Sequence, residues 1–374
     1  MTPVETADGE RTNLQGASPP AAGSPGSPAA RQQARQAVLD LTTSVYACSA
    51  LCSALQLGIL EELSMPQTPG QIADRTGADE ALVKSLLDVA VELGLAETAG
   101  NGYVCSPGAV GFASGRAKKF LIGDLRSTML QSAHLVEQSH HGSVPLGGWE
   151  QYSDPELLEA QGMRSAEPVG MLVTRLVPML EGLEARLRSP GASLLDVGTG
   201  VGRLAIEMCR HFPDLRVVGI DPYATPLELA RRNVAEAGLE GRLELRPQRV
   251  EDLGDDQQFD LAWVPVMFLP PDVAARGLVR VHTALRPGGW ALAGSMTDDG
   301  DGLQPAVLRL MAHLFGSGRL LPDQAADMLR AAGYDNVGVL PPTAGVAIRL
   351  ILGQRPLVER GQRSRREHGL RTGG

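Results

Sequence analysis

The chain has 374 residues, of which 43% are hydrophobic and 21% charged, and its formal net charge is −9. This length predicts two or three domains, and the acidic balance argues against a general binder of nucleic acid or of an anionic membrane. The apolar runs are short for a bilayer span, and the first residues lack the pattern of a signal peptide, so we expect a cytoplasmic protein that binds no membrane.

The two ends of the chain have the composition of segments without a packed core. Residues 1–30 are rich in Pro, Gly, Ala and Ser, which predicts a disordered arm. Residues 355–374 carry six arginines against two glutamates, and we interpret them as a basic flexible tail rather than an RNA-binding element.

Residues 31–115 predict a helical domain that closes with a β-hairpin. A helical, apolar pattern runs from Gln33 to Leu63, and Thr68 with Gln71 forms a capping-box pair at the start of a second helix. A third helical pattern follows, and Asn101-Gly102 then predicts a hairpin turn. The order helix, turn, helix, hairpin is typical of a winged-helix module.

The helix that would face DNA in such a module is acidic. It carries Asp79, Glu80, Asp88 and Glu92 against one cation, Lys84. Phosphates would repel this surface, because affinity for duplex DNA depends on basic side chains. We therefore expect no nucleic-acid partner and assign this domain to homodimerisation or to covering a substrate.

Residues 116–190 are predicted as a helical linker that contributes to the substrate pocket. Within them, residues 133–154 combine histidines with Trp149 and Tyr152 in polar surroundings. A lid or a pocket wall is expected at this place in the chain.

Strand and helix patterns alternate over residues 191–354. Strand patterns at 193–198, 215–221, 243–248, 259–266 and 289–295 are separated by helical patterns, and the apolar run 346–355 closes the series. This alternation predicts an α/β domain with a parallel sheet between two layers of helices. Ligands of such sheets lie beyond the carboxyl ends of the strands.

The first of these strands leads into three closely spaced glycines. Gly198, Gly200 and Gly202 follow the strand and precede a helix, but Arg203 stands where a G-x-G-x-x-G dinucleotide fingerprint has its third glycine. The loop predicts that a ligand lies against its backbone, although a plain tight turn is the alternative. Arg203 argues against NAD, because that glycine allows close packing of helix on strand.

Two carboxylates accompany the glycine loop. Asp196 lies at the end of the first strand, and Asp221 ends the next strand, 23 residues after Gly198. The first is well placed for an ammonium group and the second for two ribose hydroxyls. S-adenosylmethionine has an amino-acid end and a nucleoside end that match both carboxylates.

These motifs resemble the class I S-adenosylmethionine-dependent methyltransferases. Residues 193–221 resemble the first two motifs of that family, and residues 259–266 and 285–294 resemble its later ones. The front half resembles the small-molecule O-methyltransferases of plants and actinobacteria, so that the resemblance covers roughly residues 35–354. It implies a Rossmann-like doubly wound sheet at 191–354, behind a winged-helix dimerisation domain, with S-adenosylmethionine as the cofactor.

The resemblance also implies a set of cofactor contacts. Those contacts are Asp196, Gly198, Thr199 and Gly200 for the methionine part, Asp221 for the ribose, Pro222 and Tyr223 near the adenine, Val250 on the adenine face, and Val264 as a further contact. Many relatives have Asp where this chain has Arg249. Since Arg accepts no hydrogen bond, adenine recognition must use a backbone carbonyl or another side chain.

The catalytic base stays open. Plant-type relatives have a His after the fourth strand, and Leu269 occupies that position here, followed by Pro270 and Pro271. Either another residue serves as base, or the acceptor needs none, or no methyl group is transferred.

Several other side chains are candidates for the pocket. The weak candidates for a base or a substrate contact are His134, His140, His141 and His313, whereas His211 and His282 are expected to be structural. Trp263, Met267 and Phe268 flank the end of the fourth strand and would face an apolar acceptor. No cluster has metal-ligand spacing, so we predict no metal site and interpret the four cysteines as core residues.

We therefore predict an enzyme that transfers a methyl group from S-adenosylmethionine to a small molecule, in bacterial secondary metabolism. The alternative is an enzyme of the same fold that binds S-adenosylmethionine but catalyses a non-methylating reaction, such as cyclisation of the substrate or of the cofactor. A ligand-sensing regulator is a further rival, which the acidic helix opposes. The acceptor and the methylated atom stay open.

Overall fold

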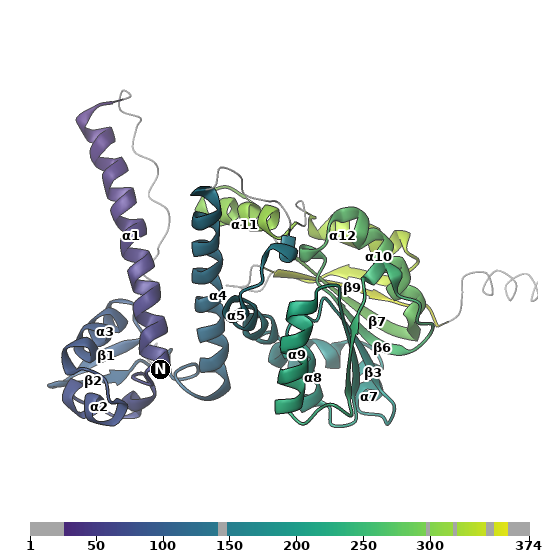
Figure 1. Cartoon of the computed structure of the whole chain (residues 1–374), viewed down its shortest axis with the longest axis horizontal. Coiled ribbons are helices and arrows are strands. Elements are labelled where there is room, and N and C mark those ends of the chain that lie inside the picture. Colours follow the sequence, from purple (N-terminus) through teal and green to yellow (C-terminus); the bar gives the residue numbers. More distant parts are fainter. Residues whose placement is uncertain (1–25, 141–147, 297–299, 317–319, 342–347, 358–374) are drawn as a thin grey trace, which may run out of the picture.

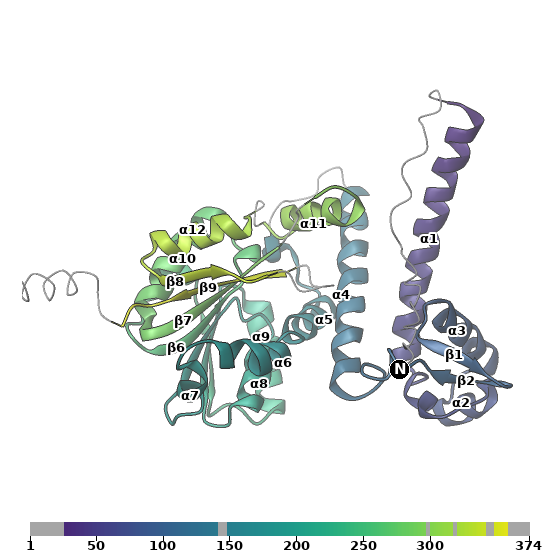
Figure 2. The same ribbon diagram turned by 180° about the vertical axis from the view of Figure 1, so that it is seen from behind.

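The computed structural model describes residues 26–140, 148–296, 300–316, 320–341 and 348–357. These residues form a mostly helical N-terminal half and a C-terminal half built on a seven-stranded sheet (Figures 1 and 2). His141, most of the predicted arm and most of the predicted basic tail lie outside the described residues.

Helix α1 (Pro28–Gln56) is long and stands away from the C-terminal half (Figure 1). It starts at Pro28, where the Ser27 side chain accepts a hydrogen bond from the Ala30 N–H, so the last residues of the predicted arm are helical. Contrary to our expectation, this helix is long and apolar enough to cross a membrane: an 18-residue window has a mean hydropathy of 1.4 and is 17% buried. Buried core helices meet the same criterion of length and composition.

The rest of the N-terminal domain has the predicted order of elements. These elements are η1 (Glu61–Ser64), α2 (Pro69–Thr76), α3 (Glu80–Glu92), β1 (Ala96–Ala99) and β2 (Gly102–Cys105). The predicted capping box is confirmed, because the Gln71 N–H donates to Thr68 Oγ1 and the Thr68 N–H donates to Gln71 Oε1. Gly77, with φ +71°, ends α2 in the left-handed conformation and turns the chain into α3.

Helices connect the two halves. They are α4 (Gly115–His140), η2 (Gly148–Gln151), α5 (Pro155–Ala166), α6 (Val169–Met171), η3 (Leu172–Leu176), η4 (Val177–Met179) and α7 (Leu183–Leu187). Helix α4 packs closely on α5 at Gly123, where a Cβ atom would lie 2.4 Å from the Cβ of Met163. Ser127 Oγ and Gln131 Nε2 both donate to Gln161 Oε1 across this contact, at 2.8 and 3.0 Å. This buried polar network fixes α5, and α5 is one wall of the site described below.

The C-terminal half is an α/β sheet domain. Its elements are β3 (Ser193–Val197), α8 (Arg203–His211), β4 (Arg216–Asp221), α9 (Ala224–Glu236), β5 (Leu243–Pro247), η5 (Val250–Asp252), β6 (Phe259–Val264), η6 (Val266–Phe268), α10 (Pro271–Ala284), β7 (Leu285–Met296), α11 (Leu303–Leu314), α12 (Pro322–Ala331), β8 (Asp335–Val339) and β9 (Ile348–Gln354). The strand order is β5-β4-β3-β6-β7-β9-β8. The chain runs outward from β3 to β5 and then returns to place β6 on the other side of β3, which creates a switch point beside β3.

The prediction of a wholly parallel sheet was wrong at one edge. Strands β3 to β7 are parallel, but β9 runs antiparallel to both β7 and β8. Strand β8 was not predicted, because its residues, Asp335–Val339, are mostly half-buried and include a polar pair and a glycine. Such an edge strand lacks the continuous apolar run of a strand buried on both faces.

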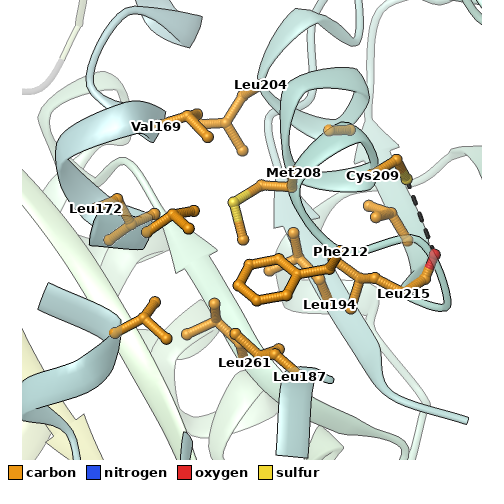
Figure 3. Close-up of a cluster of buried hydrophobic side chains, with 14 of the residues drawn as sticks. Val169, Leu172, Leu187, Leu194, Leu204, Met208, Cys209, Phe212, Leu215 and Leu261 are labelled. Carbon is orange, nitrogen blue, oxygen red and sulfur yellow. Dashed lines mark hydrogen bonds between the residues drawn. The ribbon is translucent and has the colours of Figure 1, made fainter. Parts of the chain in front are cut away.

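Two apolar cores cover the two faces of the sheet. On one face, Phe212 packs with Met208, Leu187, Leu194 and other buried side chains between α7, α8 and the strands (Figure 3). On the other face, α10 and α12 cover residues such as Leu195 and Phe259. Successive side chains of each buried strand point to opposite faces, so each strand contributes to both cores. The carboxyl ends of the strands remain for the site.

Candidate active site

The glycine loop after β3 has a backbone that only glycine adopts without strain. Gly198, Gly200 and Gly202 have φ values of +65°, +55° and +77°. The Thr199 N–H donates to the Ile220 carbonyl of β4 at 3.0 Å, and the Gly202 N–H donates back to the Thr199 carbonyl at 2.9 Å. The loop is thus held against the ends of β3 and β4, and its glycines leave backbone open toward the cavity described below.

Asp196 is buried directly under this loop. Its Oδ2 accepts a hydrogen bond from Thr199 Oγ1 at 2.7 Å, and the residue is 1% exposed. Burial is the main cause that raises the pKa of Asp196 to about 7; the Thr199 hydrogen bond opposes this rise, and the nearby Asp221 carboxylate adds to it. A cationic group placed beside this carboxylate would be strongly favoured.

Asp221, at the end of β4, ties the glycine loop to the next turn. Its Oδ2 accepts from the Gly200 N–H at 3.0 Å and its Oδ1 accepts from the Tyr223 N–H at 2.9 Å. Burial raises the pKa of Asp221 to about 6, against the effect of these two backbone hydrogen bonds. Each oxygen retains a lone pair, so the carboxylate can still accept from two hydroxyl groups of a ligand.

A large cavity of about 790 Å³ opens in front of these residues. Of the predicted cofactor contacts, those that line it are Asp196, Gly198, Thr199, Gly200, Asp221, Pro222, Tyr223 and Val250. Val264 does not line it: this side chain is fully buried in the core on the face of α10, and its neighbours Trp263 and Pro265 reach the cavity instead. The alternation of side chains along β6 accounts for this difference.

The turn after β5 offers one hydrogen-bond acceptor in place of the missing Asp. Arg249 is exposed at the cavity wall and accepts nothing. Gln248 also lines the cavity, and its Nε2 donates to the Asp252 carbonyl at 3.0 Å. That bond fixes the amide orientation, because the carbonyl can only accept, and so leaves Gln248 Oε1 as an acceptor.

A second part of the cavity wall is largely apolar. It is built by α5, α6, η3, η4, η6, α11, the end of β7 and the start of β9, and its apolar members include Leu158, Val169, Met171, Leu172, Leu176, Met179, Met267, Leu269, Met296, Leu308, Met311 and Leu350. Five of these are methionines, whose flexible thioethers adapt to irregular shapes. Trp263, Met267 and Phe268 line the cavity, as predicted from the sequence.

Three aromatic rings from distant segments meet at this wall. Trp149 of η2, Phe268 of η6 and Phe315 after α11 lie with ring centroids 5.1–5.3 Å apart in every pair. Tyr152 stacks behind Trp149 at 5.1 Å, and His134 behind Tyr152 at 4.9 Å. The sequence indicated Phe268, and Trp149 as part of an expected lid or pocket wall, but not Phe315 and not that the three rings meet, because Trp149 and Phe315 are 166 positions apart and carry no common motif.

The candidate histidines lie elsewhere in the described structure. His134 packs on Tyr152 behind the aromatic wall, and His140 and His313 are exposed; none of the three lines the cavity. Leu269, at the position of the expected base, does line it. Among the described residues, no group of three or more His, Cys, Asp or Glu side chains is placed to hold a metal ion.

The residues present fit S-adenosylmethionine. The buried carboxylate of Asp196 faces the glycine loop and has no cationic partner among the described side chains. The carboxylate of Asp221 can still accept hydrogen bonds from a diol. The space beside Gly200 is open, since a Cβ on this residue would meet no protein atom closer than 4.0 Å. When bound, this cofactor supplies a methyl group on a positively charged sulfur.

Comparisons with known proteins support a methyltransferase with S-adenosylmethionine as its cofactor. Residues 194–289 match the family model described as a methyltransferase domain, and residues 39–113 match an O-methyltransferase dimerisation domain. The chain is 30% identical to the N,N-dimethyltransferase OxyT of Streptomyces rimosus over 300 residues, which cover 75% of this chain and 84% of that protein. It is 34% identical to a release factor glutamine methyltransferase of Cereibacter sphaeroides over 184 residues, 45% of this chain and 62% of that relative.

A solved structure shares the fold across nearly the whole length. Human N-acetylserotonin methyltransferase in complex with S-adenosylmethionine superimposes with a TM-score of 0.58 at 17% identity, covering 90% of this chain and all of that one. At this identity the similarity concerns the fold: a helical front half followed by the Rossmann-like sheet.

Proposed function

We propose a substrate site and an assembly for this chain, which belongs to the S-adenosylmethionine-dependent methyltransferases that carry an O-methyltransferase dimerisation domain. It is an enzyme that methylates a small molecule. The acceptor lies on the apolar wall of the cavity, and the reaction belongs to a pathway of secondary metabolism in the cytoplasm. The observation that carries this proposal is that one continuous cavity joins the carboxylates of β3 and β4 to the apolar wall of α5, η3 and α11.

Each part of the chain has its own role in this proposal. Residues 31–115 serve dimerisation, residues 116–190 complete the substrate pocket, and residues 191–354 bind the cofactor. Asp196 holds the ammonium group, Asp221 the ribose hydroxyls, Val250 the adenine face, and Gln248 Oε1 the adenine amino group that Arg249 cannot serve.

The protein contributes to the reaction mainly by aligning the acceptor with the cofactor and by excluding water. Trp263 and Pro265 of the β6 end close the cavity beside the loop, and the apolar wall excludes water from the acceptor. Since the sulfonium methyl group is already activated, alignment of the acceptor at attack distance supplies most of the acceleration.

Calorimetric titration of the full chain with S-adenosylmethionine and with S-adenosylhomocysteine tests the proposal. We expect comparable affinities, because a transferase must accommodate its product. A strong preference for the sulfonium would favour the non-methylating alternative, to which the relatives named above lend no support. Failure of both to bind would overturn the assignment of the loop.

A second copy of the chain covers the open side of α1. Val38, Leu39, Leu41, Val45 and Tyr46 on this side are 57–74% exposed, and the dimerisation-domain match begins at residue 39. Exposed apolar surface of this kind is typical of an interaction site.

Sedimentation analysis of two matched variants tests the dimer. Val38→Lys places a charge in the middle of the apolar side, and Gln33→Lys places the same charge about 140° away around the helix, on its polar side. We expect monomers with the first variant and dimers with the second. A monomeric wild-type chain would refute the proposal.

A further inference from the structure

We infer that the atom methylated is an amine nitrogen, and that Trp149, Phe268, Phe315 and Glu150 form a subsite for the positive charge that develops on this nitrogen as the methyl group is transferred. We refer to these four residues as the ammonium subsite. The inference deepens the proposed function and rests on it, because it concerns the acceptor of the same cavity.

The three rings form a fixed wall rather than a chance contact. Gln151 Nε2 donates to the Leu314 carbonyl at 3.1 Å, which fastens η2 to the end of α11. Gly148 comes so close that a Cβ on it would lie 3.1 Å from the Phe315 carbonyl oxygen. The rings of Trp149 and Phe315 stack at an interplanar angle of 16°, and Phe268 meets both edge-on. Aromatic faces attract ammonium and methylammonium groups, most strongly where water is excluded.

Glu150 follows Trp149 in η2, and its negative charge would attract an ammonium group. Glu150 lines the cavity and forms no ion pair within the described part of the chain. Burial raises the pKa of Tyr223, and the charge of Glu150 raises it further, so this carboxylate lies near enough to the end of β4 to influence the Tyr223 hydroxyl.

Two of the cations at the cavity wall are neutralised by the protein itself. Arg164 pairs with Asp124 at 2.9 Å, and Arg203 pairs with Glu159 at 2.8 Å. Arg175 on η3 and Arg249 after β5 also line the cavity and have no such partner among the described residues. Arg175, on the apolar wall, would attract an anionic acceptor, and this makes it the matched residue for testing the inference.

The apolar wall activates an amine and deactivates a phenol. Burial in apolar surroundings disfavours charged forms, so it lowers the pKa of an ammonium group and raises that of a phenol. The nucleophile is the neutral amine in the first case and the phenolate anion in the second. With Leu269 where a histidine base would stand, the cavity favours the group that becomes nucleophilic by desolvation alone.

The reaction balances without a further reactant. The nitrogen lone pair forms the new bond to the methyl carbon, the bond from that carbon to sulfur breaks, and its electron pair stays on sulfur. The positive charge passes from sulfur to nitrogen. The methylated ammonium product forms beside the ring faces and Glu150, and loses its proton to water where it carries one.

Three probes that share a 4-hydroxyphenyl group test the subsite by calorimetry on the full chain saturated with S-adenosylhomocysteine. They are the cation N,N,N-trimethyltyramine, its neutral isostere 4-(3,3-dimethylbutyl)phenol and the anion 3-(4-hydroxyphenyl)propanoate. We expect the cation to bind about tenfold more tightly than the isostere. Glu150→Gln and the double change of Phe268 and Phe315 to Leu should reduce this preference, whereas Arg175→Gln should not.

The outcomes separate the inference from the function on which it rests. Three results would each overturn the amine assignment while S-adenosylhomocysteine still binds. The cation and its isostere could bind equally, or none of the three probes could bind. The anion could also bind most tightly and lose this affinity in Arg175→Gln. Failure to bind S-adenosylhomocysteine would overturn the proposed function itself. Glu150 is exposed, so its variant remains informative if the leucine variant fails to fold.

Discussion

Replacement of Asp221 by Asn tests the part of the site on which most of the argument depends. The carboxylate accepts hydrogen bonds from the Gly200 and Tyr223 N–H groups at 3.0 and 2.9 Å, one on each oxygen. Asn keeps one acceptor oxygen and turns an NH₂ group toward the other donor, so the loop loses one charge-assisted bond and the ribose loses one partner. Together these losses predict about 2–4 kcal/mol weaker binding, roughly 30- to 1,000-fold in Kd.

Calorimetry with both S-adenosylmethionine and S-adenosylhomocysteine distinguishes a role of Asp221 at the ribose from a role in binding the positive charge. The two ligands share the ribose and differ in charge at sulfur, so a role at the ribose weakens both equally. A purely electrostatic role would weaken the sulfonium more. Asp214→Asn, an exposed carboxylate before β4, is the matched control and should change nothing. Binding within about threefold of wild type in Asp221→Asn would refute the reasoning.

Three further predictions follow from the described geometry. Binding of S-adenosylhomocysteine should weaken at least about thirtyfold from pH 8 to pH 5.5, because its ammonium group needs an ionised Asp196, whose pKa is about 7; Asp196→Asn should reduce this dependence to the few-fold change that Asp221, whose pKa is about 6, contributes. The same variant should raise the Tm of the free protein at pH 8 but not at pH 4, since a carboxyl whose pKa is raised by folding contributes stability that is lost as the pH rises through 7; an unchanged Tm at pH 8 would contradict the burial argument. Gly200→Ala should cost only about 1–2 kcal/mol of stability by denaturant titration, because its Cβ meets no protein atom closer than 4.0 Å, yet should abolish binding, and a variant that binds would show that the loop is not the cofactor cradle.

A fourth prediction concerns the core. Phe212→Ala should destabilise the protein by about 3–5 kcal/mol, since the ring is 1% exposed within the cluster of Figure 3. A loss of unfolding free energy below about 1 kcal/mol in urea denaturation would mean that the neighbouring side chains move in to fill the space left by the ring.

The sequence by itself determined the features that depend on short-range patterns. The capping box at Thr68 and Gln71, the alternation of strands and helices, and the glycine loop with Asp196 and Asp221 all follow from local backbone chemistry or fixed spacing. Those signals sufficed for the fold class and for the cofactor side of the cavity, because a cofactor held by backbone and strand ends requires particular residues at particular spacings.

Tertiary structure alone decided the acceptor side. The rings of Trp149, Phe268 and Phe315 come from three segments that share no pattern, and they meet only because η2 and α11 pack together over the end of β6. The direction of β9 was likewise undetermined, since an apolar strand pattern has the same period in either direction. Val264 does not line the cavity for a related reason: adjacent residues of a strand face opposite sides, and the packing of α10 decided which side was core.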